Sequence, residues 1–172
     1  AQGSERTTVA AQTADAPKPG DMLSGLDFFF RFFEPKPDTA YPLLASNPKT
    51  AVYDISAHTV YMPDGKKLEA HSGFGEFLDD PSSVGRRDLG PTPPNIYRLS
   101  LRPALFHGVQ ALRMTPAGDG KMFGRNGFLA HPYMLGEDGA SNGCLSFRNY
   151  EAFLRAYQVG EVKQVIVLPR LD

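Results

Sequence analysis

The one cysteine of the chain, Cys144, is the residue best suited to nucleophilic chemistry. It ends the short run Ser141-Asn142-Gly143-Cys144, and a helix predicted just downstream favours a thiolate through its dipole. Gly143 permits a tight turn that can aim backbone N–H groups at one point, as an oxyanion hole requires. A buried structural cysteine is the alternative, since cysteine is among the residue types most often buried.

His131 is the candidate base for this thiol. It lies in an apolar, strand-like segment, and the short loop 136–140 returns the chain towards the end of that segment. A thiol needs such a base, or a lowered pKa, to be nucleophilic near neutral pH. Alkylation of Cys144 is therefore expected to have its midpoint below that of a free thiol, and His131→Ala is expected to raise it. A histidine buried and satisfied in the core is the alternative.

The other histidines carry weaker signals. His71 precedes Ser72 at the end of a predicted strand, where it either lines a groove or caps the strand. His58 and His107 lie next to turns and are expected to be solvated. No histidine pair has a ligand spacing such as H-x-x-x-H, so no metal site and no cofactor is expected.

The elements that position these residues are predicted to be mainly β-strands. Alternating or continuous apolar runs indicate strands over 51–56, 59–62, 67–72, 95–101, 109–114, 128–134 and 163–168. An apolar stripe at helical spacing predicts one helix between its N-cap Asn149 and Gly160, just past its end. The fold class is therefore mainly β, with one or two short helices.

Length and composition limit the class of protein further. A chain of 172 residues predicts one domain plus a tail, and a single cysteine excludes an internal disulfide framework or a multi-cysteine zinc site. A net charge of −1 argues against a nucleic-acid binder driven by bulk positive charge. No apolar run reaches the roughly 18 residues that a bilayer span needs. A monomer is expected, since nothing suggests a coiled coil or another dimerisation helix, although the sequence leaves the oligomeric state open.

Three segments are predicted along the chain. Residues 1–20 are poor in large apolar side chains and indicate a flexible linker. Residues 21–50 are rich in Phe and Pro, and we interpret them as a strap that packs on the domain rather than as a membrane-surface foot or a plug over a groove. Residues 51–172 form the predicted catalytic domain. The chain begins without methionine, so a leader or anchor upstream is compatible with it.

The order of these features resembles the L,D-transpeptidase catalytic domain. That family carries a histidine, a spacer and then Ser/Thr-His-Gly-Cys, and here His131 precedes Ser-Asn-Gly-Cys at 141–144. The segment GPTPPNIY at 90–97 is similar to the family's TPPGTY segment. The short spacer between histidine and cysteine most resembles a divergent branch that includes the toxic L,D-transpeptidase effectors of type VI secretion. The resemblance covers roughly residues 51–168.

The resemblance implies an L,D-transpeptidase-like β-sandwich with Cys144 as the acylated nucleophile and His131 as its base. Backbone N–H groups of Gly143 and Cys144 would form the oxyanion hole, with Ser141 and Asn142 supporting the turn. Asn142 replaces the second histidine of the usual motif, and Ser146 stands where many members carry an arginine. Weaker candidates for substrate contacts are His71, Ser72, Arg125, Tyr133, Ser146 and Arg148, with Lys121 as a further source of positive charge.

The implied function is cysteine-dependent acyl transfer on peptidoglycan stem peptides, in the periplasm or outside the cell. The Cys144 thioester would form with loss of the terminal D-Ala and then react with an amine of another stem, a D-amino acid or water. The sequence does not identify which of these three acceptors reacts with the thioester. Two alternatives share the fold: a non-catalytic peptidoglycan-binding module, and a secreted antibacterial effector that uses the same chemistry.

Overall fold

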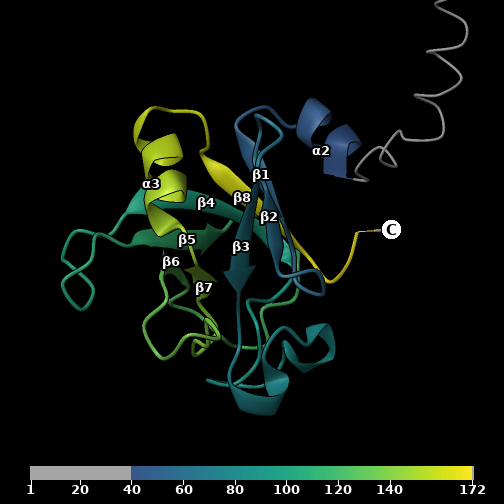
Figure 1. Cartoon of the computed structure of the whole chain (residues 1–172). Coiled ribbons are helices and arrows are strands. Elements are labelled where there is room, and N and C mark those ends of the chain that lie inside the picture. The colour runs from purple at the N-terminus through teal and green to yellow at the C-terminus, as the bar shows by residue number, and fades with distance from the viewer. Residues whose placement is uncertain (1–39, 172) are drawn as a thin grey trace, which may run out of the picture. The chain divides into compact units, whose positions relative to one another are not determined.

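The computed structural model describes residues 40–171, so the predicted linker and most of the predicted strap lie outside the described part of the chain. Helices α2 (Ala40–Ser46) and α3 (Tyr150–Gln158) accompany eight strands (Figure 1). The strands are β1 (Thr50–Asp54), β2 (Thr59–Tyr61), β3 (Lys67–His71), β4 (Asn95–Leu101), β5 (Leu112–Pro116), β6 (Leu129–Pro132), β7 (Leu145–Phe147) and β8 (Gln164–Leu168). Two 3-10 turns, Gly75–Phe77 and Pro81–Ser83, lie in the long connection between β3 and β4.

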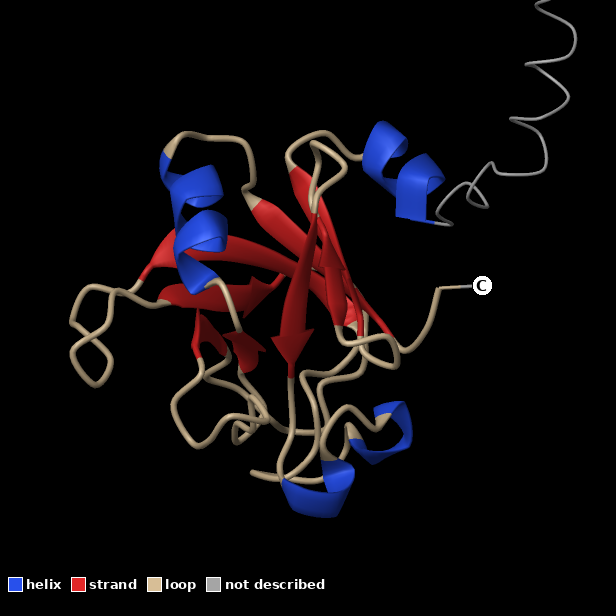
Figure 2. Ribbon diagram, in the orientation of Figure 1, coloured by secondary structure: helices blue, strands red, loops and turns tan. Residues whose placement is uncertain are grey.

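The eight strands close into one barrel in the order β1-β2-β3-β7-β6-β5-β4-β8. Figure 2 shows the strands in red and the loops that connect them in tan. The last two strands of the chain complete the barrel. Strand β8 pairs in parallel with β1 and antiparallel with β4. Strand β7 pairs antiparallel with β3 and in parallel with β6. The prediction of a mainly β fold with short helices is confirmed. The expected sandwich is replaced by a closed barrel, because β7 and β8 each join two strands that would otherwise be edges.

Most of the predicted strands are present within a few residues of their expected bounds, and β4 matches its prediction. The largest differences are β5, which begins three residues later than predicted, and β7, which occupies residues expected to form a turn. A strand of three residues has too few positions for an alternating pattern, so only its pairing with β3 and β6 reveals it. Residues 40–46 of the predicted strap form α2, which packs near β1.

The core lies inside the barrel, where every strand contributes at least one buried apolar side chain. Helix α3 packs on the barrel through the predicted apolar stripe, and the ring of Phe153 stacks on Phe147 of β7 at 4.3 Å between centroids. Asn149 is its N-cap, since its side chain accepts a hydrogen bond from the backbone N–H of Ala152. Across residues 40–171, no helix is both long enough and apolar enough to cross a membrane.

Candidate functional site

Strand alternation in β7 determines which way the candidate nucleophile points. Leu145 and Phe147 are fully buried in the core, so Cys144 and Ser146 project to the opposite face of the sheet. Ser146 is paired with His71 of β3 and with His131 of β6. Because paired residues share a face, His131 and Cys144 stand on the same side of the barrel wall, one strand apart.

Cys144 and His131 line one cavity of about 140 Å³, closed in part by Phe106, His107, Met134 and Leu135. His131 is only 3% exposed, whereas Cys144 is half-buried. Cys144 also lines a second, more polar cavity of about 280 Å³, whose walls include Arg87, Asp88, Arg125 and Asn142. The thiol therefore stands between a compartment that holds its candidate base and one that carries positive charge.

The protonation state of His131 follows from its hydrogen bond. Its Nδ1 lies 2.6 Å from the carbonyl oxygen of Pro132, and a carbonyl can only accept, so Nδ1 carries the proton. In the neutral ring Nε2 then has a free lone pair. Burial lowers the pKa of His131 and outweighs the opposing effect of the Pro132 hydrogen bond, so the ring is neutral near pH 7.

The pKa of Cys144 moves in the opposite direction from the one expected. Burial raises it, although the backbone of Leu129 and the charge of Arg125 oppose the rise. Strand β7 separates Cys144 from α3, so the thiol is not at a helix N-terminus and gains nothing from the helix dipole. The expectation of a dipole-stabilised thiolate is wrong: the resting pair is a thiol beside a neutral imidazole.

The rate of Cys144 alkylation by iodoacetamide is therefore expected to have its pH midpoint above that of an ordinary thiol, because the folded chain holds the proton more tightly. The matched reference is the same chain unfolded in denaturant, since Cys144 is its one thiol. A folded midpoint below the unfolded one would indicate a thiolate–imidazolium pair instead.

The turn before Cys144 is held by hydroxyl groups. Gly143 has φ of 112°, in a region that favours glycine, and its carbonyl accepts from Thr92 Oγ1 at 2.6 Å and from Ser72 Oγ at 3.2 Å. Ser141 Oγ donates to the Cys144 carbonyl at 2.6 Å. In a trans peptide the C=O and N–H point in opposite directions, so the hydroxyls that hold the Gly143 carbonyl also orient the N–H of Cys144.

Arg125 fixes the loop that packs behind this turn. Its guanidinium is buried and donates to the carbonyls of Val84 at 2.6 Å, Pro91 at 2.8 Å and Gly90 at 2.9 Å. A Cβ on Gly143 would collide with its Nη2. Arg125 was predicted as a weak substrate contact, and it borders the polar cavity, but most of its hydrogen-bonding capacity is used inside the protein.

Three other predicted contacts form a separate cluster around Glu69. His71 Nε2 lies 3.0 Å from Glu69 Oε1, Tyr133 donates its hydroxyl to the same oxygen at 3.1 Å, and Arg148 reaches Oε2 at 3.1 Å. His71 also lies 2.5 Å from Asp79 through Nδ1. None of these five side chains lines the two Cys144 cavities.

The remaining predicted residues take different places. Asn142 is exposed and donates to the Asp88 carbonyl at 2.9 Å. Ser146 is buried between two histidine-bearing strands, and its hydroxyl lacks a hydrogen-bond partner within residues 40–171. Lys121 lies over the ring of Phe123, outside both cavities.

Two residues that the sequence did not single out belong to the site. Thr92 lies in the proline-rich segment 90–97, and its hydroxyl holds the Gly143 carbonyl. Arg87 is exposed on the wall of the polar cavity. The run Gly-Pro-Thr-Pro-Pro was a usable signal for Thr92, because a hydroxyl in such a rigid segment is well placed to hold a partner. No local pattern distinguishes Arg87 from other surface arginines.

The comparisons with known proteins add one finding. Residues 66–171 match the model of the Tlde1 domain family. The matched segment contains β3 to β8, and with them Cys144, His131 and the hydroxyls that hold the Gly143 carbonyl. A comparison with curated proteins finds no match.

Proposed function

Because the chain belongs to the Tlde1 domain family, a family of type VI effectors of the L,D-transpeptidase type, we propose that it is a cysteine acyltransferase acting on peptidoglycan stem peptides. The family match supports the effector-like branch that the short histidine-to-cysteine spacer indicated. The finer chemistry, the residues and the periplasmic or extracellular place of action are part of the proposal.

The observation that carries the proposal is the shared cavity of Cys144 and His131. The imidazole of His131 on β6 and the thiol of Cys144, which immediately precedes the neighbouring parallel strand β7, face the same cavity. The Nδ1 hydrogen bond to Pro132 leaves Nε2 as the acceptor. A buried structural cysteine would need neither a base nor a cavity. The arrangement supports general-base activation of the thiol as it attacks, rather than a preformed thiolate.

The proposed reaction has two steps. The Cys144 thiol passes its proton to Nε2 of His131 while Sγ attacks the carbonyl carbon that joins the third residue of the stem to the terminal D-Ala. The oxyanion accepts hydrogen bonds from the backbone N–H groups of Gly143 and Cys144. Collapse breaks the C–N bond, the amine of D-Ala leaves with the proton from His131, and a thioester remains. An amine or water then attacks the thioester and restores the thiol.

The polar cavity on the other side of Cys144 suits the charged ends of such a substrate. Stem peptides present carboxylates close to the scissile bond, and Arg87 stands on the cavity wall with its guanidinium accessible. Arg125 adds positive potential from within. This cation pair takes the place of the arginine that many family members carry two positions after the cysteine, where this chain has Ser146.

The test is mass spectrometry of a purified disaccharide-tetrapeptide incubated with the protein, with and without a free D-amino acid, beside the Cys144→Ala variant. We expect loss of D-Ala, exchange or dimer formation with the native chain and an unchanged substrate with the variant. The product identifies the acceptor as water, a D-amino acid or a second stem. Muropeptide binding that survives in the variant, with no product from either protein, would contradict the enzyme and favour the binding-module alternative.

A delivered effector is distinguished from a housekeeping enzyme by its effect on a host. Expression of the chain in the periplasm of a susceptible bacterium is expected to arrest growth, and the Cys144→Ala chain is expected to be harmless. Equal growth with both chains would leave the acyltransferase without an antibacterial role.

A further inference from the structure

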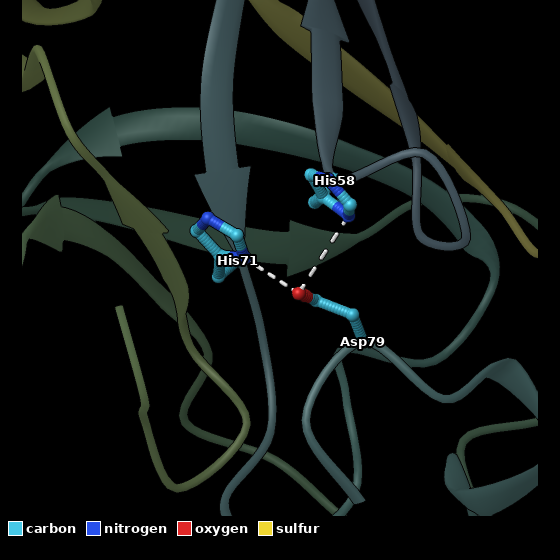
Figure 3. Close-up of side chains that lie close together, drawn as sticks. All are labelled: His58, His71 and Asp79. Carbon is cyan, nitrogen blue, oxygen red and sulfur yellow. Dashed lines mark hydrogen bonds and ion pairs between the residues drawn. The ribbon is translucent and has the colours of Figure 1, made fainter. Parts of the chain in front are cut away.

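His58, His71 and Asp79 present three potential metal ligands to one another (Figure 3). His58 lies in the turn between β1 and β2, His71 ends β3, and Asp79 belongs to the loop that follows. Their ligand atoms all lie within 4.8 Å of one another. We propose that this cluster binds a divalent transition-metal ion, with Zn²⁺ as the best fit. The proposal does not depend on the acyl transfer described above.

The chemistry of the donors favours such an ion. Two imidazole nitrogens and one carboxylate oxygen suit Zn²⁺, whereas Ca²⁺ and Mg²⁺ prefer oxygen ligands alone. Three protein ligands with water in the fourth position form a common tetrahedral zinc arrangement. The sequence did not predict the site, because its ligands come from three segments and have no helical spacing.

The spacing of the donors is close to what the ion needs. Ligands at about 2.0–2.2 Å from a tetrahedral ion lie roughly 3.3 Å from each other. Oδ2 of Asp79 lies 3.9 Å from Nδ1 of His58 and 2.5 Å from Nδ1 of His71. To bind the ion, the His58–Asp79 distance must shorten and the His71–Asp79 distance must lengthen, each by less than about 1 Å. A bound ion would replace the proton that now lies between His71 and Asp79.

Outer hydrogen bonds already orient the ligands as metal sites require. With Nδ1 of His71 on the ion, its Nε2 donates to Glu69 Oε1 at 3.0 Å, the carboxylate–histidine pairing found behind metal-bound imidazoles. The carboxylate oxygen of Asp79 that does not face the ion, Oδ1, accepts a hydrogen bond from the backbone N–H of Ser72 at 3.1 Å. The two imidazoles are nearly parallel, with centroids 5.1 Å apart, and both face the Asp79 carboxylate.

The site is accessible from solvent. The side chain of His58 is 53% exposed, while those of His71 and Asp79 are 12% and 15% exposed. An ion can therefore enter past His58 and be held by two ligands that are already fixed. Since Asp79 accepts from Ser72, and Ser72 donates to the Gly143 carbonyl, a bound ion would also stiffen the segment behind the catalytic turn.

The experiment is a calorimetric titration of Zn²⁺ into the metal-stripped full chain carrying Cys144→Ala, which prevents zinc binding by the thiol. We expect one ion per chain. Adding His58→Asn or Asp79→Asn is expected to weaken binding by at least about 10–100-fold, since losing even an outer-shell partner of a metal ligand costs that much. Asparagine is chosen because both positions have positive φ, 41° and 57°, which it tolerates. The matched control is His107→Asn, an exposed histidine with φ of 47°, which should bind zinc like the parent.

A second measurement needs no ligand variant. In the chain that carries only Cys144→Ala, zinc is expected to shift the imidazole NMR signals of His58 and His71 and to leave those of His107 and His131 in place. No zinc binding, an affinity unchanged by both ligand variants, or zinc-induced shifts confined to His107 or His131 would each overturn the proposal.

Discussion

Replacing His131 by glutamine is expected to lower the rate of Cys144 acylation by about 10²–10⁴-fold, the usual contribution of a positioned general base. The glutamine amide can still donate to the Pro132 carbonyl, so the cavity keeps its shape, but it cannot take a proton from the thiol. Because burial raises the pKa of Cys144, little thiolate is present to react without the base. The measurement is the single-turnover rate of D-Ala release.

The pH dependence of the same rate tests whether His131 acts as a general base or only fills space in the cavity. Burial lowers the pKa of His131, so native activity is expected to persist below the ordinary histidine pKa and to fall only as the pH drops through the lowered value. This acid limb should vanish in His131→Gln. His107→Asn is the control, since His107 is exposed at the same cavity and should change the rate less than tenfold. A native acid limb that persists unchanged in His131→Gln would remove His131 from the base role.

Replacing Arg125 by methionine is expected to destabilise the fold by about 2–4 kcal/mol, because the buried carbonyls of Val84, Gly90 and Pro91 lose their donor. That corresponds to a fall in Tm of roughly 5–15 °C for a domain of this size. Methionine fills much of the same volume, so the loss reports the hydrogen bonds rather than a cavity. The stability of Arg125→Lys should lie between that of the native chain and that of Arg125→Met, since one ammonium cannot span three carbonyls as a guanidinium fork does.

Arg113→Met is the matched control. Arg113 is exposed on β5, and its replacement should change the free energy of unfolding by less than about 0.5 kcal/mol. A stable Arg125→Met chain that loses only activity would show that Arg125 acts on the substrate instead of the loop.

The sequence was most informative where a pattern is local or where a resemblance supplies it. The apolar stripe of 150–157 and the Asn149 cap specify α3, because helix periodicity and capping act over a few residues. Residue type and chain position pointed to His131 and Cys144, the resemblance to L,D-transpeptidases supported the pair, and the structure brings both residues to one cavity. The predicted position of the helix just after Cys144 also suggested a helix-dipole effect on the thiol, and that prediction was wrong because β7 lies between them.

Contacts between segments that lie far apart in the chain could not be predicted from local sequence patterns. Strand β7 is too short to show a period and exists because β3 and β6 bind it on both sides. The hydroxyls of Ser72 and Thr92 meet the Gly143 carbonyl across 71 and 51 positions of chain. His71, Tyr133 and Arg148 looked like substrate contacts, yet they converge on Glu69.

The chain order of residue types thus specified a mainly β domain, one capped helix and a nucleophile with a base upstream, because periodicity, capping and side-chain chemistry are properties of short segments. Barrel closure, the burial that raises one pKa and lowers the other, and the meeting of His58, His71 and Asp79 arose only in three dimensions. Burial and electrostatic environment are set by which distant segments pack together, and no short run of residues encodes them.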